Sequence, residues 1–144
     1  MPRIIVGDAR LELKKLGNER FDMIILDAFS SDMIPTHLLT REALELYLQR
    51  LTPDGVILFH ISNRYFKLDR PLVAAGELLG LKNAYVSQAN LLSFYASASK
   101  WIVFTRQNVD LTPLSETRWT PTVPPDKAQP WTDDYTDLLG ALNF

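Results

Sequence analysis

The sequence contains no cysteine and only two histidines, His37 and His60. Without cysteine the chain has no disulfide, no thiolate zinc ligand and no cysteine nucleophile. The two histidines are not in the H-x-x-x-H or H-E-x-x-H spacing that places metal ligands on one helix face. We therefore expect no metal site.

Long apolar runs and basic clusters are missing as well. No run approaches the roughly 20 apolar residues that a membrane span requires, and the N-terminus lacks the regions of a signal peptide. The 144 residues carry a net charge of −2 with scattered Lys and Arg, which argues against nucleic-acid binding. With 47% hydrophobic residues, the chain is expected to form one cytoplasmic, non-membrane domain with a packed core.

Short apolar runs alternate with amphipathic segments, which predicts an α/β fold with a mostly parallel sheet and right-handed crossovers. The expected strands are Arg3–Val6, Phe21–Asp27, Val56–Phe59, Ala84–Gln88 and Trp101–Thr105. The Phe21–Asp27 run is almost continuously apolar, which is typical of a strand buried on both faces. The link before the last strand is expected to form a hairpin or a gate over the site.

Capping residues and glycines predict where the helices lie. The helices are expected from Asp8 to Gly17, from Thr40 to the turn at Thr52–Gly55, and from Asp69 to Gly80. Residues 111–144 are rich in proline, which predicts an extended surface segment; Thr132–Asp134 would then cap a short helix that ends near Leu139. The expected organisation is an α/β domain over residues 1–110 and a proline-rich tail over residues 111–144.

Polar side chains stand where three of the expected strands end: Asp8, Asp27 and His60. Open α/β sheets bind ligands at the carboxyl ends of their strands. A carboxylate there can attract a cationic substrate and take its proton. Each residue also has a structural alternative, because Asp8 can cap a helix, Asp27 can bond loop amides and His60 can be a structural strand-end residue.

Three motifs occur in a fairly specific order and spacing. They are Gly7-Asp8-Ala9-Arg10, then Leu26-Asp27-Ala28-Phe29-Ser30-Ser31-Asp32, then Pro53-Asp54-Gly55 followed by His60-Ile61-Ser62-Asn63-Arg64-Tyr65. Together they resemble the spermidine synthase family, over about residues 2–106 and again at Trp131–Tyr135. The resemblance implies a Rossmann-like methyltransferase fold. It also implies transfer of an aminopropyl group from decarboxylated S-adenosylmethionine to a diamine or polyamine.

The resemblance also implies residue roles. Asp8 would accept a hydrogen bond from the adenine amino group of the co-substrate, with the Ala9 backbone beside the ring. Asp27 matches the strand-end aspartate that deprotonates and orients the attacking amine.

The substrate side departs from the family pattern. The second acid of the family stands where this chain has Ser30, so Asp32 either turns into the pocket or faces solvent. His60 replaces a glutamine; a neutral His60 can hydrogen-bond the amine, whereas a protonated one would repel a polyamine. Tyr95 roughly matches a pocket tyrosine. Asp32, His60 and Tyr95 are the expected substrate-binding residues.

The family's glycine-rich loop and the acid that follows it belong to two strands that would precede Arg3, and this sequence has neither. We therefore expect a partial sheet without its first two strands, in a domain fragment or truncated gene product that is inactive alone and does not necessarily bind a cofactor. An open apolar edge invites self-association, which predicts a homodimer. The alternatives are S-adenosylmethionine-dependent methyl transfer and a non-catalytic, self-associating module.

Overall fold

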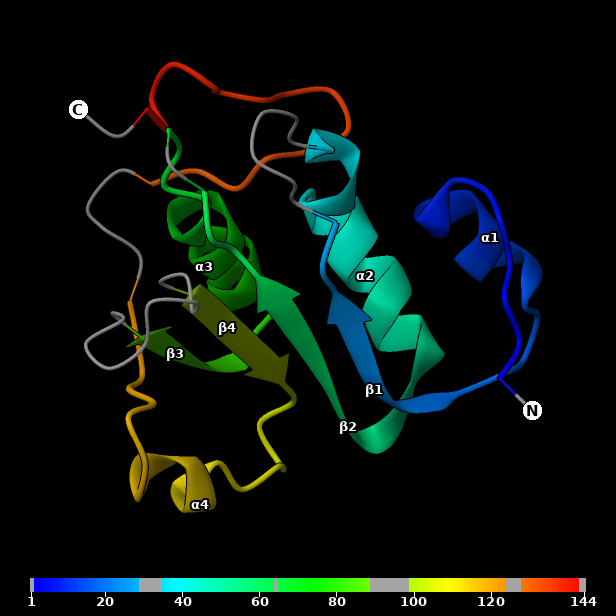
Figure 1. Ribbon diagram of the computed structural model, residues 1–144, viewed down its shortest axis with the longest axis horizontal. Coiled ribbons are helices and arrows are strands. Elements are labelled where there is room, and N and C mark those ends of the chain that lie inside the picture. Colours follow the sequence, from blue (N-terminus) through cyan, green and yellow to red (C-terminus); the bar gives the residue numbers. More distant parts are fainter. Residues whose placement is uncertain (1, 29–34, 64, 89–98, 124–127, 143–144) are drawn as a thin grey trace, which may run out of the picture.

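The computed structural model describes residues 2–28, 35–63, 65–88, 99–123 and 128–142. Its sheet contains β1 (Phe21–Leu26), β2 (Leu51–His60), β3 (Lys82–Gln88) and β4 (Ser99–Thr105), in the order β1-β2-β4-β3 (Figure 1). β1 and β2 are parallel, and β4 runs antiparallel between β2 and β3, so three of the four strands point the same way. The prediction of an α/β fold with a mostly parallel sheet is confirmed.

The helices pack mainly against one face of this sheet (Figure 1). They are α1 (Ala9–Lys15), the 3₁₀ helix η1 (Thr36–Leu38), α2 (Arg41–Arg50), α3 (Asp69–Leu78) and the short α4 (Thr112–Ser115). α2 and α3 form the layer on the sheet, and α1 lies beside α2. No helix in the described part of the chain is long and apolar enough to cross a membrane.

Most predicted helix ends are confirmed. Asp8 accepts a hydrogen bond from the Leu11 amide, and Thr40 accepts one from the Ala43 amide, so both residues cap their helices. Gly17 and Gly80 follow the helix ends with positive φ angles, which glycine adopts without strain. The predicted cap at Asp69 is wrong, because Leu68 is the N-cap and Asp69 is the first residue inside α3.

The core forms where α2 and α3 meet the sheet. The Phe59 ring lies 6.2 Å from Tyr47 on α2 and 5.9 Å from Phe104 on β4, measured between ring centroids. Gly76 on α3 touches the same aromatic cluster, since a Cβ at this position would collide with Cε1 of Phe104. The absence of a side chain at Gly76 therefore brings α3 close to β4.

The expected strand Arg3–Val6 is not a strand. Ile4 and Val6 are 86% and 92% exposed, and Arg3 forms an ion pair with Glu19. A strand requires a neighbouring backbone with which to pair, and no described strand lies beside this segment. An apolar run by itself is therefore not sufficient to form a strand.

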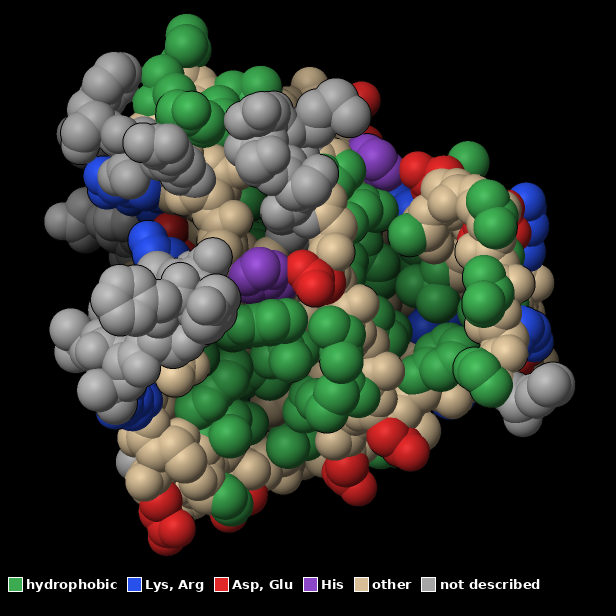
Figure 2. All heavy atoms as spheres, viewed as in Figure 1, with side chains coloured by type: hydrophobic (Ala, Val, Ile, Leu, Met, Phe, Trp, Pro, Cys, Tyr) green, Lys and Arg blue, Asp and Glu red, His purple; other side chains and the backbone are tan. Residues whose placement is uncertain are grey.

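The prediction that β1 is buried on both faces is also wrong. Met23 and Ile25 are 53% and 55% exposed, whereas Leu26 is buried. β1 lies at the edge of the sheet, and the described helices cover only the face to which Leu26 points. Hydrophobic side chains therefore gather on the uncovered face of the sheet (Figure 2).

The expected turn Thr52–Gly55 lies inside β2, which starts directly after α2 at Leu51. Phe21 pairs with Leu51 and Met23 with Val56, so the irregularity in the ladder takes up the extra residues. Arg106 stabilises this region, because its guanidinium donates to the backbone carbonyls of Leu48 and Thr52.

The expected C-terminal helix is replaced by turns. Thr132 and Tyr135 form an isolated bridge, and the Trp131 side chain is buried beneath this segment. The Trp131 carbonyl accepts a hydrogen bond from the Arg41 amide at the start of α2. The Asp133 carboxylate forms an ion pair with Arg10 instead of capping a helix. The cap predicted from the local pattern at Thr132–Asp134 is therefore wrong.

Candidate functional site

Asp27 and His60 meet at the carboxyl ends of two parallel strands. Asp27 follows the last residue of β1, and His60 is the last residue of β2. The ladder pairs Leu26 with Phe59, so the next residue of each strand lies side by side. His60 Nδ1 is 2.6 Å from Asp27 Oδ1, which is a short hydrogen bond. Two residues singled out separately in the sequence therefore form one pair.

Trp101 completes this arrangement from the third strand. It is the cross-strand partner of His60 on β4, and its ring stacks on the imidazole with centroids 4.5 Å apart and planes inclined by 24°. The His60 side chain is 23% exposed and that of Asp27 is 63% exposed. The imidazole is thus held by a carboxylate at Nδ1 and by an indole on one ring face, and it borders solvent.

The pair lies on the face of the sheet that the described helices leave open. Side chains alternate along a strand, and paired residues of neighbouring strands point to the same side. On the same side of the sheet as His60 lie the side chains of two cross-strand pairs, Met23 with Val56 and Ile25 with Leu58. An apolar surface therefore extends directly from the Asp27–His60 pair (Figure 2).

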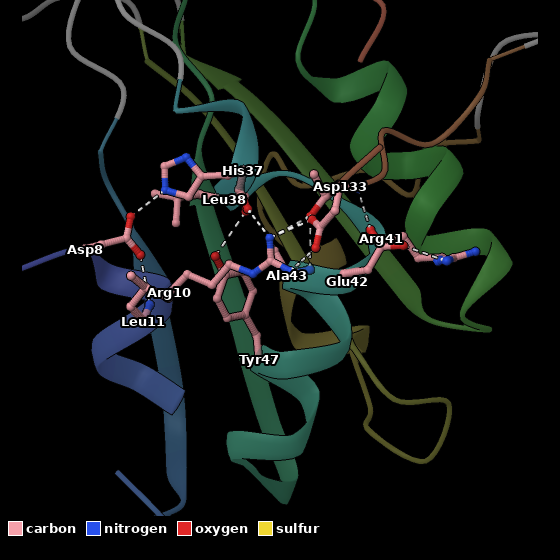
Figure 3. A network of polar contacts seen from close by, with 11 residues as sticks. Asp8, Arg10, Leu11, His37, Leu38, Arg41, Glu42, Ala43, Tyr47 and Asp133 are labelled. Atoms are coloured by element: carbon pink, nitrogen blue, oxygen red, sulfur yellow. Dashed lines mark hydrogen bonds and ion pairs between the residues drawn. The ribbon is translucent and has the colours of Figure 1, made fainter. Parts of the chain in front are cut away.

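Asp8 forms a second acid–histidine pair, with a residue that sequence reasoning missed. Its Oδ1 accepts from the Leu11 amide, and its Oδ2 lies 2.8 Å from His37 Nε2 (Figure 3). The Leu11 hydrogen bond, followed by the interaction with His37, lowers the pKa of the Asp8 carboxyl below its usual value. Ala9 is the exposed first residue of α1.

A polar network fixes the surroundings of Asp8 (Figure 3). Arg10 Nη1 and Nη2 each lie 2.7 Å from an oxygen of Asp133, and Arg10 Nη1 also donates to the His37 carbonyl. Thr40 donates its hydroxyl proton to Asp133 Oδ1 at 2.8 Å. Hydrogen bonding from Arg10 lowers the pKa of Asp133 and raises that of Arg10. The network connects α1, the start of α2 and the C-terminal tail.

The remaining predicted site residues, Asp32 and Tyr95, lie outside the described residues. The residues that sequence reasoning did not assign to a site are Arg10, His37, Trp101 and Asp133. Their partners are remote in the chain, with 29 positions between Asp8 and His37 and 123 between Arg10 and Asp133. Only strand register and tail packing bring these residues together, so local spacing contains no signal for them.

A separate cavity of about 460 Å³ lies beside α4. Its lining includes Lys82 at the start of β3, Asp110 and Trp119. Lys82 lies at the level of Val56 in the sheet, well before the strand ends that carry His60 and Asp27. Lys82 and Asn83 donate to the carbonyls of Val109 and Thr122, so these polar groups hold the surrounding loops.

The described residues contain no group of three or more His, Asp or Glu side chains placed to hold a metal ion. For a sulfonium nucleoside, the fit is partial. Asp8 retains acceptor capacity beyond its two hydrogen bonds, because each carboxylate oxygen has two lone pairs. The glycines of the chain are scattered, and the two closest in sequence are Gly76 and Gly80. Gly76 serves the packing of α3 against Phe104. The described residues therefore provide no glycine-rich loop that could hold the tail of the nucleoside.

No family model matches the sequence. A polyamine aminopropyltransferase from Vibrio vulnificus (strain CMCP6) is 44% identical over 57 residues, which is 38% of this chain and 19% of the relative. The chain therefore spans about a fifth of that curated relative.

Two solved structures are similar to this chain. A probable spermidine synthase from Corynebacterium glutamicum ATCC 13032 superimposes with a TM-score of 0.64 at 15% identity, over 96% of this chain and 58% of that structure. MnmC2 from Aquifex aeolicus gives a TM-score of 0.48 at 22% identity, over 85% of this chain and 32% of that structure.

The strand order and the structural likeness show an α/β domain with a Rossmann-like methyltransferase fold. Within that fold the chain resembles spermidine synthases, in sequence over a 57-residue segment and in the course of the backbone. The resemblance inferred from the motifs around Asp8, Asp27 and His60 is confirmed at this level.

Proposed function

We propose that this chain supplies the acceptor-activating part of an aminopropyltransferase site. The observation that carries the proposal is the 2.6 Å hydrogen bond between Asp27 and His60 at the ends of adjacent parallel strands. An amine must lose a proton when it is alkylated, and a carboxylate–imidazole pair at a ligand-binding sheet edge is suited to accept it. The 44% identical segment of a polyamine aminopropyltransferase supports the same reaction class.

Decarboxylated S-adenosylmethionine would supply an electrophilic aminopropyl carbon next to its sulfonium. Asp8 and Ala9 are the residues that would border its adenine, and the lowered pKa keeps Asp8 ionised as a hydrogen-bond acceptor at neutral pH. Asp27 is 63% exposed and negatively charged, which favours a cationic diamine over an anionic acceptor. The described residues therefore contribute acceptor activation and an adenine contact.

The test is calorimetric titration of the 144-residue chain with decarboxylated S-adenosylmethionine, S-adenosylmethionine and methylthioadenosine, followed by a transfer assay with putrescine. We expect tighter binding of the decarboxylated co-substrate, and we expect Asp27→Asn to abolish whatever spermidine formation this part of the site supports. Asp134→Asn is the matched control, because Asp134 is an exposed acid of the tail. Preference for S-adenosylmethionine would favour methyl transfer, and a folded chain that binds none of the three would contradict the proposal.

A non-catalytic, self-associating module is the second candidate. The observation that favours it is the open edge of the sheet, where β1 has β2 as its one partner among the described strands and exposes Met23 and Ile25. Antiparallel pairing of β1 with β1 of a second copy would extend the sheet through a two-fold axis and bury the same residues on both copies.

A further inference from the structure

We propose that His60 Nε2 is the proton-accepting atom of the site and that Asp27 acts through His60 as a positioning residue. This inference rests on the proposed function and assigns its proton-transfer step to particular atoms. The resemblance suggested direct deprotonation by Asp27, whereas the geometry joins this carboxylate to Nδ1 of the imidazole and leaves Nε2 as the second ring nitrogen.

The first argument is the tautomer. Asp27 Oδ1 is a carboxylate oxygen and can only accept, so in a neutral imidazole at 2.6 Å the proton must reside on Nδ1. The other ring nitrogen, Nε2, then carries the lone pair. A hydrogen bond at one nitrogen therefore determines which nitrogen accepts a proton.

The second argument is the orientation of the ring. Trp101 covers one face of the imidazole at 4.5 Å, and Asp27 fixes the edge that carries Nδ1. Three strands thus restrict the ring, since Asp27 follows β1, His60 ends β2 and Trp101 lies on β4. The His60 side chain keeps 23% of its surface exposed, which leaves it accessible to a small amine. A general base requires this combination of restricted orientation and access.

The chemical step balances with these groups. The neutral amine nitrogen forms a bond to the aminopropyl carbon as the carbon–sulfur bond breaks, and the bonding pair leaves with sulfur, which becomes a neutral thioether. The alkylated nitrogen gives its proton to His60 Nε2. The resulting imidazolium keeps its Nδ1–H bond to the Asp27 carboxylate and later releases the proton to water. Asp27 remains ionised throughout and stabilises the imidazolium.

The first test needs no turnover. In the His37→Gln background His60 is the single histidine, so ¹⁵N spectra of the imidazole at a pH where it is neutral report its tautomer directly. We expect a protonated Nδ1 and an unprotonated Nε2, and a shift toward protonated Nε2 after Asp27→Asn, because the new amide can donate to Nδ1. A protonated Nε2 in the parent, or no change after Asp27→Asn, would overturn the assignment.

The second test is kinetic and uses the 144-residue chain. Glutamine can hydrogen-bond an amine but cannot take its proton, so His60→Gln should lower kcat about 10²-fold or more with little change in KM. Imidazole in solution should restore part of the activity of His60→Ala. Activity of His60→Gln within threefold of the parent would show that Asp27 accepts the proton directly.

These outcomes separate the inference from the proposed function. A chain that has the expected tautomer but binds none of the three nucleosides would refute the function and leave the positioning of His60 by Asp27 intact. Transfer that persists in His60→Gln would support the function and refute the role of Nε2.

Discussion

Arg10 and Asp133 are 123 positions apart and form a two-point ion pair, with Nη1–Oδ1 and Nη2–Oδ2 distances of 2.7 Å. The Arg10 side chain is 11% exposed and that of Asp133 is 44% exposed. The planar guanidinium matches the carboxylate at both oxygens, which makes the contact directional as well as charged. This pair attaches the C-terminal tail to α1, next to the capping carboxylate of Asp8.

Asp133→Ala should lower the free energy of unfolding by about 1–2 kcal/mol, because it leaves the nearly buried Arg10 guanidinium without its carboxylate. The value is moderate because Asp133 is partly exposed and water screens the pair. Urea unfolding at pH 7 measures the change. Asp134→Ala is the control and should stay within about 0.5 kcal/mol; equal effects of the two variants would argue against a specific contribution of the pair.

The same pair should contribute to acid denaturation. Arg10 lowers the pKa of Asp133 below its usual value of 3.8, so the stabilisation is complete above that value and is lost as the pH falls through the lowered pKa. The difference in unfolding free energy between the parent and Asp133→Asn should therefore be largest near pH 6 and shrink below about pH 4. Urea unfolding at pH 6 and at pH 3 checks this, and a constant difference would contradict it.

Tyr47 should affect stability at the opposite end of the pH range. Burial raises its pKa above the usual value of 10.0, and its hydroxyl donates to the Leu38 carbonyl at 3.1 Å. Because the folded state holds the proton more tightly, stability is complete below about pH 10 and falls as the pH rises beyond that value.

Tyr47→Phe should cost about 1 kcal/mol at pH 7 through the lost hydrogen bond. Above pH 10 the variant should lose less stability than the parent, as measured by urea unfolding at pH 7 and pH 10.5. Tyr135→Phe is the control at pH 7, because Tyr135 is 46% exposed. Parallel losses of the parent and Tyr47→Phe at high pH would refute this role of Tyr47.

Gly76→Ala should destabilise the fold although alanine is the better helix former. The added methyl would collide with Cε1 of Phe104 and lie 2.8 Å from its Cδ1, and Phe104 is fully buried. Overpacking of about 1–3 kcal/mol exceeds or offsets the helix gain of about 1 kcal/mol. Thermal unfolding measures the net loss, with the exposed Glu77→Ala as control; a more stable Gly76→Ala would show that α3 moves freely away from β4.

Self-association through β1 predicts a particle with twice the mass of one chain in light scattering. Ile25→Lys should yield monomers, since a lysine on an edge strand opposes pairing. Ile4→Lys is the control, because Ile4 is 86% exposed and lies outside β1. A monomeric parent chain, or a dimer that survives Ile25→Lys, would exclude this interface.

Local sequence pattern determined the elements whose cause is local. The caps at Asp8 and Thr40, the stops at Gly17 and Gly80, and the strands ending near Asp27 and His60 were all predictable. Each of these features depends on a side chain or a φ angle within a few residues, so the neighbouring sequence determines its contribution to stability.

Tertiary structure decided everything that required a distant partner. Arg3–Val6 has the composition of a strand, but none of the described strands lies beside it to form a ladder, and Asp133 binds Arg10 where a local pattern suggested a helix cap. The sequence by itself determined that Asp27 and His60 are polar residues at strand ends. Only the pairing of Leu26 with Phe59 made them one hydrogen-bonded site, because register is a property of two strands and neither strand contains it alone.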